Sequence, residues 1–543
     1  MDGRLRHRQT KGPATDGPDL NSEATDAATR QRSGKAQCPA PDMHAVRESD
    51  EPIVPAKRAN KDTSSAEDTM AESVEERGST KGNARPDATC RTQSRVEREA
   101  ALARVRAVAT RDKQVQFTAL LHHVTEELLL ESFDALKRDA APGIDEVTWQ
   151  QYECDLRAKV ADLHNRIHRG AYRASPVKRV WIPKADGRQR PLGIATLEDK
   201  IVQRAVVTVL TQLYEADFRG FSYGYRPGRQ QHDALDAVSV GIVRKKVNWI
   251  LDADIQGFFD NLDHEWMLKF LRHRIADKRI LRLIQQWLTA GVSAEGEWSK
   301  TTVGTPQGAV ISPLLANVYL HYVLDLWVDW WRTKFAQGDV IIVRYADDFI
   351  VGFQHRGDAE RFRNALGQRL EKFGLSLHRE KTRLMEFGRF ANRDRQKRRA
   401  GKPETFDFLG LTHISGQTRQ GWFTVQRRSV AKRMRNKLHE LKVELRRRMH
   451  WPIREQGQWL ASVLRGWFQY HAVPGNFQRL QQFRQEVRKL WRNTIRRRSQ
   501  KGRTWNWSKF SRVCDPWLPR PRILHPWPLQ RLPVSTQGRS RMR

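Results

Sequence analysis

Three acidic residues at the ends of apolar runs are the part of the sequence best suited to chemistry. Asp347 and Asp348 separate the apolar runs 340–345 and 349–353, and Asp254 follows the run 249–253. Carboxylates on neighbouring strands suit Mg²⁺, and two such ions about 3.5–4 Å apart can activate a hydroxyl and stabilise a leaving pyrophosphate. Taken alone, Asp347 and Asp348 are equally consistent with a solvated turn, where aspartate is common.

Short strands and tight turns are predicted to hold these acids. Residues 340–353 are predicted to form a strand, a turn and a second strand, and residues 248–255 a short buried strand. Another hairpin is predicted over 177–194, with Asp186 and Gly187 as its turn. Residues 199–214 and 264–273 have helical spacing, and Asp260 and Asp263 are placed to cap the second helix. This mixture predicts an α+β sheet domain.

The charge balance indicates a polyanionic partner. Lys and Arg number 97 against 62 Asp and Glu, which gives a formal net charge of +35 over 543 residues. Nucleic acid is the partner that such an excess favours, with an anionic membrane surface as the rival. The long apolar stretch 309–331 carries Asp325 and Asp329, which predicts a buried helix and no membrane span. Four scattered cysteines and no apolar N-terminal segment favour the cytoplasm; association with the bacterial nucleoid is an expectation that comes only from the family resemblance given below.

The two ends of the chain differ in composition from the middle. Residues 1–95 hold no aromatic residue and are predicted to be a disordered leader, with a basic helix beginning near Val96. Residues 427–448 carry about ten cations on a helical pattern, which indicates either a nucleic-acid-binding surface or a solvated face. The tail from Lys501 interleaves tryptophans with arginines. It is equally consistent with base stacking on single strands and with a small proline-pinned hydrophobic subdomain.

Eight sequence blocks in one fixed order resemble the group II intron-encoded reverse transcriptases/maturases of bacteria, and the likeness covers roughly residues 116–475. A region with Leu464-Arg-Gly-Trp467 matches the maturase part of that family. The blocks lie at 142–146, 182–194 with 198–200, 220–228, 253–264, 304–308 with 312–317, 344–349, 375–382 and 406–410.

The resemblance implies a right-hand polymerase fold with fingers, a palm built on an antiparallel sheet, and a helical thumb. Its implied domains are an N-terminal extension with fingers, a palm, a thumb or maturase domain, and a short basic C-terminal module that binds DNA. They would span residues 96–235, 236–425, 426–500 and 501–543, in that order. The chain lacks the His- and Cys-rich pattern of the HNH endonuclease that ends many relatives, so we expect no such domain.

The same resemblance assigns the acids to a polymerase centre with two Mg²⁺ ions. Asp254, Asp347 and Asp348 match its catalytic, metal-binding carboxylates, and the backbone carbonyl of Ile255 is a further candidate ligand. Asp252 shares a strand face with Asp254 but is left out of this set.

Four further residues match positions that bind the incoming deoxynucleotide. Lys184 and Arg190, on the two arms of the predicted hairpin, match cations that grip the triphosphate. Phe259 matches an aromatic position where a ring excludes a 2′-hydroxyl, although an ordinary core phenylalanine is the alternative. Gln307 matches a residue near the sugar of the nucleotide and the template pair, with a plain loop as its alternative.

Nucleic-acid contacts are assigned more loosely. Arg226 is a candidate for template or phosphate contact. Lys381 matches a lysine near the primer strand or the active site, with a solvated lysine at a helix end as the alternative. Candidate contacts of the thumb are Arg427, Arg428, Lys432 and Arg435.

The implied function is RNA-directed DNA polymerisation together with binding of the group II intron RNA, which promotes splicing and intron mobility by target-primed reverse transcription. The implied partners are the intron RNA, an RNA template with a DNA primer, and a DNA target site; no membrane is involved, and a homodimer is left open. Two alternatives remain: a retron- or CRISPR-associated reverse transcriptase, and an RNA chaperone that only assists splicing. The intact acids at Asp254, Asp347 and Asp348 argue against the second.

Overall fold

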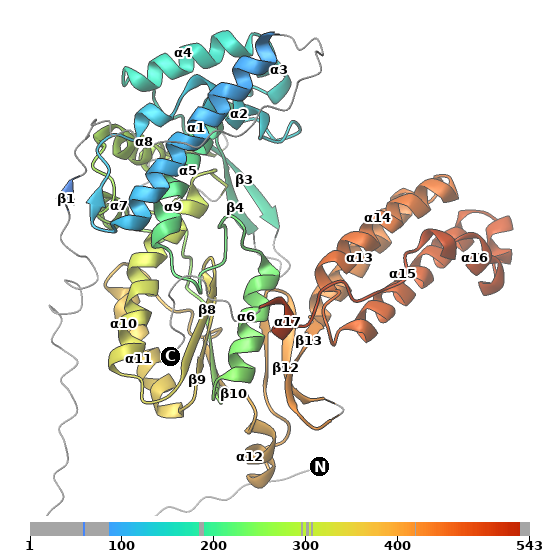
Figure 1. The fold of residues 1–543 in the computed structure, drawn as a ribbon. Coiled ribbons are helices and arrows are strands. Elements are labelled where there is room, and N and C mark those ends of the chain that lie inside the picture. The colour runs from blue at the N-terminus through green and yellow to red at the C-terminus, as the bar shows by residue number, and fades with distance from the viewer. Residues whose placement is uncertain are drawn as a thin grey trace, which may run out of the picture. The chain divides into compact units, whose positions relative to one another are not determined.

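Helices and sheets are mixed along the chain, as the sequence predicts. The computed structural model describes residues 58–59, 86–183, 189–294, 297–299, 303–305, 308–418 and 420–532 (Figure 1). Predictions for residues 1–57 and 60–85, and for the turn at Asp186 and Gly187, lie outside these ranges. No helix within the described ranges is both long and apolar enough to cross a bilayer.

A central antiparallel sheet carries the predicted acids at one end. Its strands lie in the order β10-β5-β9-β8, and β8 and β9 form a tight hairpin closed by the pair Tyr345 and Asp348. The strands predicted over 340–353 and 248–255 are therefore confirmed. Their β-branched and aromatic residues pack well on a pleated surface. The strands are β5 (Trp249–Ala253), β8 (Val340–Tyr345), β9 (Asp348–Phe353) and β10 (Arg383–Glu386).

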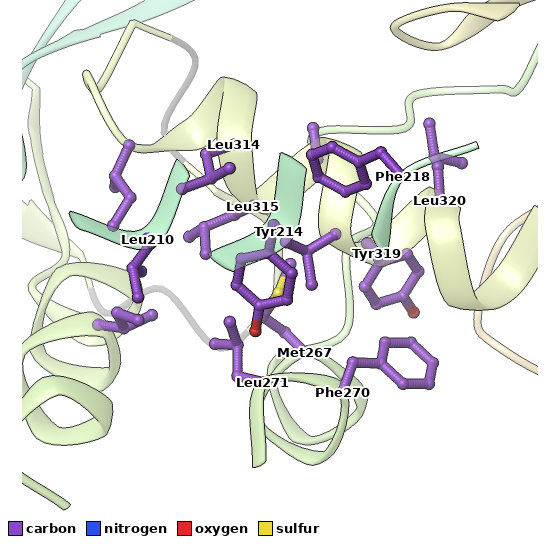
Figure 2. Close-up of a cluster of buried hydrophobic side chains, with 14 of the residues drawn as sticks. Leu210, Tyr214, Phe218, Met267, Phe270, Leu271, Leu314, Leu315, Tyr319 and Leu320 are labelled. Carbon is purple, nitrogen blue, oxygen red and sulfur yellow. The ribbon is translucent and has the colours of Figure 1, made fainter. Parts of the chain in front are cut away.

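Helices with apolar faces build the core beside this sheet. Figure 2 shows Tyr214 from α5, Phe270 from α7 and Tyr319 from α9 within one buried cluster. α11 packs against β5 and β9. Of the two predicted caps, Asp260 and Asp263, only Asp263 caps α7. Its carboxylate accepts a hydrogen bond from the amide of Trp266 at 2.9 Å. The helices are α5 (Leu197–Asp217), α7 (His264–Arg272), α8 (Lys278–Thr289), α9 (Ser312–Leu320), α10 (Leu326–Lys334) and α11 (Arg356–Glu371).

The predicted buried helix over 309–331 contains a π-helical turn. This turn, η2 (His321–Asp325), joins α9 to α10, and all its residues are buried. A π turn changes which side chains face inward and is frequent at functional sites. Here it places Asp325, which is fully buried, against the guanidinium of Arg344 on β8.

The N-terminal helices are tied to the core by a buried arginine. α1 begins at Pro86, ahead of the predicted start near Val96, and proline is favoured at the first position of a helix. Arg274 donates hydrogen bonds to the carbonyls of Ala109, Asp112 and Val115. The elements of this part are β1 (Arg58–Ala59), α1 (Pro86–Arg111), β2 (Val115–Gln116), η1 (Leu121–His123), α2 (Glu126–Asp134), α3 (Trp149–Glu153) and α4 (Leu156–His168).

A second sheet contains the other predicted hairpin. β3 (Val177–Pro183) and β4 (Gln189–Ile194) pair antiparallel, which confirms both arms. β6 (Val292–Ala294) adds to β3 in parallel, and β7 (Glu297–Ser299) completes the order β4-β3-β6-β7.

A third sheet contains the first two cations of the region 427–448, which was predicted to be helical. Arg427 and Arg428 lie on β13, so the expectation that they belong to a helix is wrong; α13 begins only at Ala431. The ladder pairs Arg427 with His413 and Arg428 with Thr412, a long-range pairing that local spacing does not reveal. The elements here are α6 (Gln231–Arg244), α12 (Ala391–Lys397), β11 (Thr405–Phe408), β12 (Leu411–Gln417) and β13 (Phe423–Ser429).

The C-terminal helices share a core of their own. Phe510, Cys514 and Leu518 from the tail are buried with Leu464 and Trp491, so this part of the tail is a packed hydrophobic subdomain. The end of the described chain returns to α6, where Arg531 Nη2 lies 2.7 Å from Asp233 Oδ1. The elements are α13 (Ala431–Arg447), α14 (Ile453–His471), α15 (Phe477–Arg498), η3 (Lys501–Thr504), α16 (Trp507–Val513), η4 (Asp515–Trp517) and α17 (Pro528–Arg531).

Candidate active site

The three predicted acids lie at the end of the central sheet where β5 and the β8–β9 hairpin end. The ladder pairs Ala253 with Phe349, so its continuation by one residue places Asp254 opposite Asp348. Asp347 lies in the turn between Tyr345 and Asp348. The fold thus brings the acids to the same end of the sheet, although Asp254 comes from a distant segment of the chain.

Burial and neighbouring charges disfavour the ionised forms of Asp347 and Asp348. Burial and the charges of the neighbouring acids raise the pKa of Asp348 to about 7. Burial also raises the pKa of Asp347, and the charge of Asp254 adds to this. Within the described ranges no three His, Cys, Asp or Glu side chains are gathered closely enough to hold an ion by themselves. The donor chemistry nevertheless fits a divalent cation, because buried carboxylates that repel each other are stabilised by one.

Lys381 is brought directly to the acids. Its Nζ lies 2.6 Å from Asp254 Oδ2. The backbone sets up this contact, since the amide of His378 donates to the carbonyl of Asp254 and the amide of Gln256 donates to that of Ser376, each at 2.8 Å. The carbonyl of Ile255 takes part in neither bond, which is compatible with its predicted role as a ligand.

The predicted nucleotide-binding cations are placed only in part. Arg190 lies on β4 opposite Ile182, and its charge partly offsets the rise that burial causes in the pKa of Asp347. It is therefore within electrostatic reach of the acids. Lys184 and Gln307 lie outside the described residues.

Phe259 lies beside a cavity that is lined by the second sheet and by the loops that follow β5 and β7. The cavity holds about 320 Å³ and is lined by Phe259 together with Leu192 and Gly193 of β4. The ring is half-buried, and the Phe259 carbonyl accepts a hydrogen bond from the amide of Thr305 at 2.8 Å. Phe259 is therefore not a fully enclosed core residue.

Comparisons with known proteins show which family the segment that carries these acids resembles. Residues 182–413 match the family "Reverse transcriptase (RNA-dependent DNA polymerase)". The chain is 32% identical over 277 residues to Protein YkfC of Escherichia coli, a match that covers 45% of this chain and 72% of the relative. It is 38% identical over 178 residues to the group II intron-encoded protein LtrA of Lactococcus lactis, which covers 33% of this chain and 29% of LtrA. The chain belongs to the group II intron-encoded reverse transcriptases/maturases.

A more distant relative extends the match to plants. Nuclear intron maturase 1 of Arabidopsis thaliana is 25% identical over 91 residues, which is 17% of this chain and 12% of the relative. The reverse transcriptase match and the intron-encoded relatives together support reverse transcription and a maturase role in intron splicing and mobility.

Two of the predicted nucleic-acid contacts of this reverse transcriptase are buried in ion pairs. Arg226 Nε lies 2.8 Å from Glu215 Oε1, and its side chain is 3% exposed. Arg427 Nη1 lies 2.5 Å from Asp236 Oδ1, because strand alternation turns it inward. Neither guanidinium is available to a phosphate, so we revise both assignments to structural roles.

The remaining predicted contacts of the reverse transcriptase are accessible. Arg428 is exposed on β13, and Lys432 and Arg435 are exposed on the first turns of α13. Their exposure leaves them suited to the phosphate backbone, which supplies sequence-independent affinity.

A buried polar network behind the acidic turn was not predicted from the sequence. Arg344 Nε lies 2.7 Å from Asp325 Oδ1, and Arg344 Nη1 donates to the carbonyl of Ala346 at 2.9 Å and to Asn317 Oδ1 at 3.0 Å. Arg344 and Asp325 are both fully buried. A signal existed, since charged residues within apolar runs are rarely buried unless paired.

Proposed function

We propose that this protein copies RNA into DNA at the end of the central sheet where β5 and the β8–β9 hairpin end. Asp254, Asp347 and Asp348 would hold two Mg²⁺ ions there. The register that sets Asp254 opposite Asp348, beside the turn with Asp347, is the observation that carries the proposal. Bound Mg²⁺ would activate the primer hydroxyl and stabilise the leaving pyrophosphate. The carbonyl of Ile255 is the further ligand that we propose.

The neighbouring elements have the roles that such a reaction requires. We assign β3 and β4 to the fingers, the central sheet to the palm, and α13 to α15 to the thumb. Lys184 and Arg190 would bind the triphosphate from the fingers, and Gln307 would contact the sugar and the template pair. Arg190 supports this assignment, because its positive charge lowers the pKa of Asp347 against the rise that burial causes.

Primer extension tests the polymerase proposal. The purified chain is given an RNA template annealed to a DNA primer, with deoxynucleotides and Mg²⁺, and the extended products are measured. We expect extension that stops when the Mg²⁺ is chelated. A chain that binds the duplex but never extends it would instead support the splicing-only alternative.

Intron splicing tests the maturase function. We propose that the exposed cations of α13 and β13 bind intron RNA. Arg428, Lys432 and Arg435 form no ion pair with an acid in the described part of the chain, so their charges are available to phosphates. The intron RNA that flanks the reading frame is incubated at low Mg²⁺ with and without the protein. Faster splicing with the protein is the expected result, and an intron with no response would exclude a maturase role.

Phe259 offers a prediction about nucleotide choice. We expect Phe259→Val to increase the incorporation of ribonucleotides relative to deoxynucleotides by about ten-fold or more, because the smaller side chain leaves room for a 2′-hydroxyl. The ratio of kcat/KM for the two substrates is the measurement. Phe258→Leu, a change at the buried neighbour that packs edge-on against Phe259, is the control. Equal selectivity for deoxynucleotides in the wild type and in Phe259→Val would show that Phe259 only packs against the core.

The tail offers a prediction about DNA binding. Deletion from Lys501 would remove Phe510, Cys514 and Leu518 from the core, so surface changes are the better test. We expect glutamine at Arg503, Lys509 and Arg512 together to weaken binding to target DNA and to reduce its salt dependence by up to about three ion equivalents. Binding is measured by titration at several salt concentrations, and primer extension serves as the control that should not change. Unaltered affinity and salt slope would contradict a DNA-binding tail.

A further inference from the structure

An exposed aromatic residue in a strained conformation lies beside the acidic turn. Tyr225 has φ of 56°, in the left-handed region that residues other than glycine rarely adopt, and it is 58% exposed. Such strain persists only where the surrounding structure imposes it, and it is concentrated at functional sites. Tyr225 itself has no part in the roles assigned above.

The buried network fixes this segment to the acidic turn. A Cβ at Gly224 would lie 2.3 Å from the amide nitrogen of Ala346, so only glycine permits this approach. Asn317 Nδ2 donates to the carbonyl of Gly224 at 2.7 Å, and Asn317 Oδ1 accepts from Arg344. Ala346 is itself left-handed, with φ of 59°. Tyr225 is therefore held in a set position relative to Asp347.

The surroundings of the phenol are those of a ligand contact. The rings of Tyr225 and Tyr345 have centroids 6.4 Å apart. Partial burial and the charge of Asp347 raise the pKa of Tyr225, while the charge of Arg190 lowers it, so both residues are near the hydroxyl. No hydrogen bond joins that hydroxyl to any residue in the described part of the chain. The protein thus presents a rigid ring and an uncommitted donor next to the reaction centre.

We propose that Tyr225 binds the base pair at the primer terminus, with its ring against the pair and its hydroxyl donating to a minor-groove acceptor. The proposal rests on the polymerase function proposed above. Purine N3 and pyrimidine O2 are acceptors at every base pair in the minor groove, so this contact is independent of sequence, as copying requires. The minor groove of an A-form duplex is also wide and shallow, which admits a side chain.

An atomic change in the primer tests the hydrogen bond. The primer ends in adenine or in 3-deazaadenine, which has a C–H in place of the N3 acceptor, and the dissociation constant of the primer–template is measured by fluorescence anisotropy without nucleotides. We expect the wild type to lose about five-fold in affinity on the deaza primer, the order of one hydrogen bond. Tyr225→Phe should lose as much on the adenine primer and show no further loss on the deaza primer.

Tyr225→Ala tests the ring contact. We expect its affinity for the adenine primer to fall on the order of ten-fold to a hundred-fold, since base–aromatic contacts contribute this much. Trp422→Ala is the matched control, because Trp422 is 70% exposed and lies outside the proposed site; its affinity should not change. Circular dichroism and the melting temperature establish that all three variants are folded.

The outcomes separate this inference from the function on which it rests. An equal response of wild type and Tyr225→Phe to the deaza primer overturns the hydrogen bond, and wild-type affinity in Tyr225→Ala overturns the whole proposal. Because binding is measured without nucleotides, a wild-type chain that binds the duplex but does not extend it would refute only the polymerase function.

Discussion

We expect Asp347→Ala to abolish primer extension on an RNA template while the protein remains folded. The turn between β8 and β9 would lose a carboxylate that we assign to the metal ions, and the loss should be about a thousand-fold in rate, the equivalent of about 4 kcal/mol. Splicing of the intron should be largely retained, because the RNA carries out that chemistry and the protein supplies binding. Single-turnover extension and a splicing assay on the same preparation are the measurements.

Stability gives this prediction a second signature. Burial raises the pKa of Asp347, so its charged form is unfavourable in the folded protein and its removal should leave the melting temperature unchanged or higher. Asp252→Asn is the control, because Asp252 pairs with Arg383 across the β5–β10 ladder and is not one of the proposed ligands. Primer extension at the wild-type rate by Asp347→Ala would refute the metal assignment. Loss of extension in Asp252→Asn would show that the proposed set of ligands is incomplete.

Arg344→Met should produce the largest loss of stability among the changes considered. It leaves Asp325 fully buried without its partner, and breaking a buried ion pair in this way costs about 3–5 kcal/mol. The carbonyl of Ala346 also loses its donor. We expect a clear fall in the denaturant midpoint together with loss of primer extension. An unchanged midpoint would contradict the structure of this network.

The double variant Arg344→Met with Asp325→Leu separates stability from positioning. Replacing both charges by apolar groups removes the unpaired carboxylate, so we expect much of the lost stability to return. Extension should stay low with a reduced kcat and a nearly unchanged KM for the nucleotide, because the turn that carries Asp347 is no longer held by a hydrogen bond. Arg95→Met, which breaks an ion pair between two exposed side chains, is the matched control and should affect neither property.

The elements that carry the acids could be predicted because their signals are local. Residues 340–353 contain two apolar β-branched runs around a short polar turn, and that pattern alone specifies a hairpin. Asp263 was recognised as a cap from its position just before an amphipathic helix. The eight ordered blocks then supplied the family, which the comparisons confirm.

The parts that could not be predicted depend on partners far away in the chain. Arg427 resembles the other cations that follow it, and only the pairing with β12 and the acid at Asp236 show that it is buried. The position of Lys381 beside Asp254 likewise depends on a backbone contact between distant segments. Strain at Tyr225 has no sequence signature at all, since a tyrosine before arginine and proline is an ordinary loop residue.

The order of strands in the central sheet has a consequence for biosynthesis. β5, which ends at Asp254, lies between β9 and β10, and both partners follow it in the chain. The strand therefore leaves the ribosome with both edges unpaired, whereas β8 and β9 can join at once through their tight turn. Unpaired strand edges are templates for association with other chains. The arrangement that assembles the reaction centre thus creates a period during synthesis when the nascent chain needs protection from aggregation.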